Sequence, residues 1–132
     1  MVLTLTRPVL DILFAEAQRA HPIECCGLLL GPSEDRVDLA LPARNVAPDQ
    51  ARHFEIDPQA LVDAHRAERR GGPKLLGYYH SHPTGIAQPS ATDRAQAGGD
   101  GRLWAIIGGR EITLWRDGGE HFERLPYEVI DS

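Results

Sequence analysis

The chain has 132 residues, of which 42% are apolar and 25% are charged, and its formal net charge is -5 at pH 7. This length and composition suit a globular protein with one hydrophobic core, so we expect a single domain over residues 1–132. Acidic and basic residues are interspersed and form no basic stripe, which argues against nucleic acid as a partner. No oligomeric state is predicted.

Cellular placement follows from the cysteines and the apolar runs. The two cysteines, Cys25 and Cys26, are adjacent, and sequence neighbours rarely satisfy disulfide geometry. A chain without a disulfide framework is typical of a reducing compartment. The apolar runs are too short to span a bilayer, and residues 1–6 lack the apolar core of a signal peptide. We therefore expect a cytoplasmic protein without a membrane partner.

In chain order, the first elements form a strand, a helix and a hairpin. Residues 2–6 alternate apolar and polar side chains, which predicts a strand. Pro8 suits the first turn of a helix that we expect to end near Ala20, before His21-Pro22. Residues 25–30 are small or apolar throughout, which indicates a buried strand. Residues 36–41 alternate again and could pair with that strand as a hairpin.

The second half alternates helices and strands. After a loop at 42–52 and a short strand at 54–56, Asp57-Pro58 is typical of the start of a helix, here to about Arg70. We expect a central strand at 74–80, a helix from about Ser90 to Gly98, and strands at 103–107, 112–115 and 122–125. This order predicts an α/β fold with a mixed central sheet flanked by helices.

The residues that indicate chemistry begin at the end of the predicted central strand. His80 and His82 are two positions apart, so both imidazoles lie on one face of an extended segment. Asp93 follows eleven residues after His82, and a loop with the start of a helix could bring its carboxylate back to them. Two histidines and one carboxylate leave a fourth tetrahedral position open, as in catalytic zinc sites with bond lengths of about 2.0–2.2 Å. We therefore predict zinc at His80, His82 and Asp93.

Glu24 is the candidate for the acid or base that peptide hydrolysis needs. It precedes the buried strand, between Ile23 and Cys25, where a charge is costly unless it serves a purpose. Zinc activates a water molecule, and a neighbouring carboxylate can take the proton of that water and return it to the leaving amine.

With these residues the chain resembles the JAMM (MPN-plus) metalloprotease family. The pattern of that family is a glutamate, then at a distance His-x-His, seven residues, Ser, two residues and Asp. Glu24, His80, His82, Ser90 and Asp93 match each fixed position. The segments Glu24-Cys25-Cys26-Gly27-Leu28-Leu29-Leu30-Gly31 and Phe54-Glu55-Ile56-Asp57-Pro58 also look like family members, so the resemblance covers nearly the whole chain.

The resemblance implies a role for each matched residue. His80, His82 and Asp93 would bind zinc, Glu24 would be the general acid and base, and the Ser90 hydroxyl would donate to the oxyanion of the tetrahedral intermediate. The implied fold is the cytidine-deaminase-like MPN/JAMM fold. Deaminase chemistry is not implied, because no Pro-Cys-x-x-Cys ligand pair occurs in the chain.

Several of these residues also have ordinary structural interpretations. Ser90 and Asp93 could serve as the N-cap and first-turn acid of a helix, and this role can coexist with catalysis. Glu24 could be an acid at the edge of a strand. Strand alternation turns Ser81 away from both histidines, so we predict a structural role for it. Cys25 and Cys26 are interpreted as buried small hydrophobes rather than ligands.

The resemblance implies a zinc-dependent peptidase or isopeptidase that cleaves an amide at the C-terminus of a ubiquitin-like protein ending in di-glycine. The compact chain has only short loops at 42–53 and 98–102, which favours a sulfur-carrier protein or its adduct over polyubiquitin. The alternative is a non-catalytic MPN scaffold subunit, against which the complete set of site residues argues. A relative that acts in DNA repair is a third possibility, and the missing basic patch argues against it.

Overall fold

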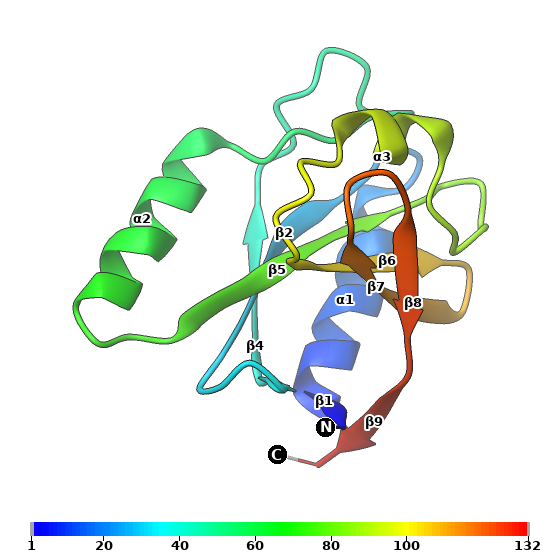
Figure 1. Cartoon of the computed structure of the whole chain (residues 1–132). Coiled ribbons are helices and arrows are strands. Elements are labelled where there is room, and N and C mark those ends of the chain that lie inside the picture. The colour runs from blue at the N-terminus through cyan, green and yellow to red at the C-terminus, as the bar shows by residue number, and fades with distance from the viewer. Residues whose placement is uncertain (1, 132) are drawn as a thin grey trace.

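The computed structural model describes residues 2–131 and contains two sheets and three helices within that range (Figure 1). The helices are α1 (Arg7–Ala20), α2 (Pro58–Arg69) and α3 (Ala91–Gln96). The strands in chain order are β1 (Leu3–Thr6), β2 (Cys26–Gly31), β3 (Arg36–Val37), β4 (Leu39–Ala43), β5 (Lys74–Ser81), β6 (Leu103–Gly108), β7 (Glu111–Asp117), β8 (Phe122–Leu125) and β9 (Tyr127–Ile130).

The larger sheet has six strands in the order β4-β2-β5-β6-β7-β8. β5 and β6 run parallel, with Gly77 opposite Leu103, and the other neighbouring strands are antiparallel. The predicted α/β class with a mixed central sheet is therefore confirmed. β5, the strand predicted to be central, lies between β2 and β6, so its end is enclosed by neighbours on both sides.

Each face of this sheet carries its own hydrophobic cluster. Val9 and Leu13 of α1 pack with Leu29 of β2 on one face. On the other face, Ala64 of α2 packs with Leu28 of β2 and with Trp104 of β6. The residues of β2 are apolar or small throughout because a strand covered on both faces has no solvent-facing side.

Local capping explains where the two longer helices begin. The Thr6 hydroxyl accepts a hydrogen bond from the Val9 N–H at 3.4 Å, and the Asp57 carboxylate accepts one from the Gln59 N–H at 3.1 Å. A proline occupies the first turn of each helix, as predicted. None of the helices in residues 2–131 is long and apolar enough to cross a membrane.

Three features differ from the sequence-based expectations. The alternating segment 36–41 is divided at Asp38: β4 pairs with β2 as predicted, but β3 pairs with β1 in the smaller sheet, whose order is β3-β1-β9. β9 was not predicted, and it pairs in parallel with β1. The expected strand at 54–56 is reduced to one bridge between Asn45 and Ile56. β3 and β9 depend on pairing with β1, which is far from both in sequence, and local periodicity does not encode such pairing.

Candidate metal and catalytic centre

The two histidines of the sequence motif lie at the C-terminal end of β5. Their imidazoles share the face that α2 covers, and His80 is fully buried while His82 is 9% exposed. Ser81 points to the opposite face, where its hydroxyl accepts a hydrogen bond from the Cys25 N–H at 2.9 Å. The predicted structural role of Ser81 is confirmed, because this bond fixes the end of β5 to the segment that carries Glu24.

Asp93 lies in the first turn of α3 and is almost completely buried. The turn is a capping box: the Ser90 hydroxyl accepts from the Asp93 N–H at 3.0 Å, and the Asp93 carboxylate accepts from the Ser90 N–H at 2.9 Å. The capping interpretation of both residues is thus confirmed. Capping also immobilises the Asp93 side chain, so its carboxylate is held in one position relative to β5.

The carboxylate of Asp93 faces both imidazoles. Its two oxygens lie 3.0 Å from the Nε2 atoms of His80 and His82, and these Nε2 atoms are themselves 3.0 Å apart. If His82 is neutral, its proton is on Nδ1 beside the Ile86 carbonyl, so its Nε2 lone pair faces a carboxylate oxygen of Asp93 and two lone pairs oppose each other. Three tetrahedral ligands at about 2.0–2.1 Å from one ion are separated by about 3.3 Å. The spacing therefore fits a bound cation.

Glu24 lies beside these side chains, two residues before the first residue of β2. It is 4% exposed, and its Oε1 atom has no hydrogen-bond partner within residues 2–131. Ligand atoms of Glu24, His80 and His82 all lie within 4.8 Å of one another, a cluster able to bind a metal ion. The backbone of Glu24 is fixed by a loop, because its N–H donates to the Gln50 carbonyl and its carbonyl accepts from the Asn45 amide.

Burial and neighbouring charge set the protonation of the site. Burial raises the pKa of Glu24 from its ordinary 4.5 to about 7, a tendency that His82 opposes and Asp93 reinforces. Burial also lowers the pKa of His80. For His82, burial acts in the same direction, but the Asp93 carboxylate and the Ile86 carbonyl outweigh it and raise the pKa. For Asp93, burial is outweighed by its hydrogen bonds to the histidines, so the pKa falls well below its usual range.

The two imidazoles are supported in different ways. His82 Nδ1 lies 2.7 Å from the Ile86 carbonyl oxygen, to which it donates, so the lone pair is on Nε2. His80 Nδ1 is buried and has no partner in the described chain. Its ring stacks on Phe54 instead, with ring centroids 4.2 Å apart and planes 16° from parallel. Phe54 was not predicted to belong to the site, because a stacking contact across 26 positions leaves no local pattern in the sequence.

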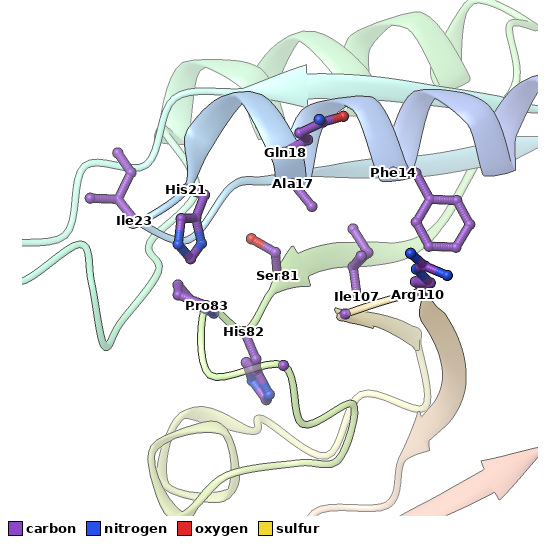
Figure 2. Close-up of a pocket in the computed structure, with 12 residues that line it drawn as sticks. Phe14, Ala17, Gln18, His21, Ile23, Ser81, His82, Pro83, Ile107 and Arg110 are labelled. Carbon is purple, nitrogen blue, oxygen red and sulfur yellow. The ribbon is translucent and has the colours of Figure 1, made fainter.

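A cavity of about 540 Å³ lies next to this centre but on the α1 side of the sheet. Figure 2 shows Phe14 and Ala17 of α1 above it, Ser81 pointing toward it, and the imidazole of His82 directed away. Glu24, His80 and Asp93 are not among its lining residues. Of the three residues of the triangle only His82 lines the cavity, so the cavity adjoins the triangle of ligand atoms but does not contain it.

Comparison with known proteins connects this geometry with one family. A family model described as prokaryotic homologues of the JAB domain matches residues 6–118. The desampylase of Haloferax volcanii is 38% identical over 111 residues, which are 82% of this chain and 79% of that protein. A probable TtuB-protein conjugate cleaving protease of Thermus thermophilus is 36% identical over 86% of this chain and 82% of its own length. The CysO-cysteine peptidase of Mycobacterium bovis is 32% identical over 99% of this chain and 85% of its own length.

Solved structures agree with the fold. A protein from Desulfitobacterium hafniense superposes with a TM-score of 0.86 at 28% identity, covering 99% of this chain and 94% of that one. A structure described as a metalloprotease-like zinc site of the JAMM type in the proteasome and signalosome superposes with a TM-score of 0.65 at 21% identity. That alignment covers 98% of this chain and 99% of the other, and the predicted MPN/JAMM fold is confirmed.

Proposed function

Since this chain belongs to the family of prokaryotic homologues of the JAB domain, we propose that it hydrolyses an amide bond at the C-terminus of a ubiquitin-like protein. The resemblance to JAMM proteases is confirmed by the family match and by relatives that are peptidases or conjugate-cleaving proteases. The observation that carries the proposal is the 3.0 Å triangle of His80, His82 and Asp93 with Glu24 beside it.

In this proposal His80, His82 and Asp93 hold a zinc ion. The donor set of two imidazole nitrogens and a carboxylate is the one that catalytic zinc uses, and the depressed pKa of Asp93 keeps that ligand ionised. When bound, zinc supplies a Lewis acid and a water molecule that is acidic near neutral pH. Cys25 and Cys26 are not part of the donor set, because they are buried in the two hydrophobic clusters and neither belongs to the group of ligand atoms found within residues 2–131.

Glu24 is assigned the proton transfers. A carboxyl whose pKa is about 7 can accept a proton from the attacking water and donate it to the leaving amine at neutral pH. Its unpartnered Oε1 is free for this task, and the fixed backbone keeps it beside the histidines. Such a positioned base contributes about 10²–10⁴-fold to turnover.

Ser90 is assigned the stabilisation of the oxyanion. As the N-cap of α3 its oxygen already accepts a hydrogen bond from the Asp93 N–H, but its hydroxyl proton remains available. The same side chain can therefore cap the helix with a lone pair and donate to the substrate. Loss of an oxyanion donor typically slows turnover by about 10²–10³-fold.

The substrate we propose is a ubiquitin-like sulfur-carrier protein, or its adduct, with a C-terminal di-glycine. The relatives named above include a desampylase, a TtuB-conjugate cleaving protease and a CysO-cysteine peptidase. Residues 1–132 would act as one domain. Glycine residues next to the scissile bond would suit a centre whose side chains are almost completely buried, since they need the least space.

The test is incubation with candidate ubiquitin-like fusions from the same cell, with and without a chelator, read by intact mass. We expect cleavage directly after the di-glycine, abolished by the chelator and restored by added zinc. Glu24→Gln should bind zinc and leave the fusions intact. A folded wild-type protein that binds no zinc and cleaves no fusion would instead support the scaffold alternative.

A further inference from the structure

The two histidines of the centre differ in what fixes their rings. A metal-binding histidine usually donates its second N–H to a carbonyl or carboxylate, which orients the ring. His82 follows this rule through the Ile86 carbonyl, whereas His80 Nδ1 has no hydrogen-bond partner in residues 2–131. The orientation of His80 must therefore come from packing.

Two aromatic rings provide that packing. Phe54 lies flat against the imidazole, with centroids 4.2 Å apart and an interplanar angle of 16°. Trp104 meets the same imidazole perpendicularly, at 5.6 Å and 90°, and also meets the edge of Phe54 at 5.6 Å and 77°. Phe54 and Trp104 are buried, so solvent does not loosen this arrangement.

The geometry assigns Phe54 as the positioning residue for His80, an inference that rests on the proposed metal site. The outer torsion of a histidine side chain has a broad energy profile, so an imidazole without a hydrogen bond at Nδ1 could rotate. Rotation would carry Nε2 away from the 3.0 Å contacts with His82 and Asp93. The flat face of Phe54 fixes the ring plane and keeps Nε2 directed at the metal position.

The test compares zinc affinity, by chelator competition, in Phe54→Leu and Phe54→Tyr. Leucine keeps apolar bulk but removes the flat face, so we expect zinc affinity to fall about 10-fold or more, as for other residues that orient ligands. Tyrosine keeps the face and should restore affinity to near the wild-type value. The visible spectrum of the cobalt-substituted protein should change in Phe54→Leu, since it reports ligand geometry.

Phe122→Leu is the matched control, because Phe122 contacts Trp104 at 4.9 Å in the same cluster. It should lower the melting temperature of the metal-free protein but leave zinc affinity and the cobalt spectrum unchanged. Wild-type affinity in Phe54→Leu, or equal losses in Phe54→Leu, Phe54→Tyr and Phe122→Leu, would overturn the inference while leaving the proposed function intact. A wild-type protein that binds no zinc would overturn both.

Discussion

Replacing Glu24 by glutamine should abolish cleavage but make the metal-free protein more stable above pH 7. The metal-free folded protein binds a proton at Glu24 more tightly than the unfolded chain does, because burial raises the folded pKa from 4.5 to about 7. The wild-type protein should therefore lose stability as the pH rises from about 4.5 through 7, where the buried carboxyl ionises. Glutamine cannot ionise, so Glu24→Gln should be the more stable protein above pH 7.

The size of this effect follows from the same pKa values. One unit of pKa corresponds to 1.36 kcal/mol, so the rise at Glu24 sets an upper bound of about 3 kcal/mol on the cost of ionisation. The side chain is 4% exposed, and relaxation around the charge reduces the cost, so we expect about 2 kcal/mol at pH 8. At pH 5 the folded carboxyl is neutral, and the difference between the two proteins should fall below about 1 kcal/mol.

The assay is urea unfolding of chelator-treated wild type and Glu24→Gln at pH 5 and pH 8. The difference in free energy of unfolding between the two proteins at one pH is free of contributions from groups that titrate in the same way in both. Glu55→Gln is the matched control, since Glu55 is exposed and its replacement should change stability by less than about 0.5 kcal/mol at either pH. A stability difference between Glu24→Gln and wild type that is the same at both pH values would refute the assigned pKa and the burial argument.

Three further outcomes are expected. Ser90→Gly should lower turnover by about 10²–10³-fold yet cost only a few tenths of a kcal/mol, because glycine is also an acceptable N-cap; an active variant would remove Ser90 from the mechanism. Zinc affinity, measured by chelator competition, should fall as the pH drops from 8 to 6, since protonation of His82, whose pKa is raised, competes with the metal. Cys25 and Cys26 should be unreactive toward a thiol reagent at pH 8 and should both react in denaturant, because burial raises their thiol pKa values; rapid labelling of the native protein would contradict their burial.

The elements that could be predicted from sequence are those with a local physical cause. The start of α1 was foreseeable from the first-turn proline Pro8, and the start of α2 from Asp57 as a cap followed by Pro58, whereas the cap at Thr6 was not predicted. β2 was foreseeable from its apolar run. By contrast, β3 and β9 are short and exist because both pair with β1, and a pairing between segments far apart in sequence leaves no periodic signal in either.

The candidate site divides in the same way. The spacing of His80 and His82 places both on one face, and the helix start at Ser90 predicts where Asp93 lies. The protonation of Glu24 depends on burial by segments far along the chain, so no sequence pattern could give its raised pKa. The stacking of Phe54 on His80 is likewise a product of tertiary packing.

Anomalous X-ray scattering at the zinc edge, from crystals of the zinc-treated protein, would show whether His80, His82 and Asp93 hold the ion. We expect one strong peak about 2.0–2.2 Å from Nε2 of His80, Nε2 of His82 and a carboxylate oxygen of Asp93, with Glu24 outside the bonding distance. A peak bonded to Glu24 in place of Asp93, or no peak among these side chains, would contradict this assignment.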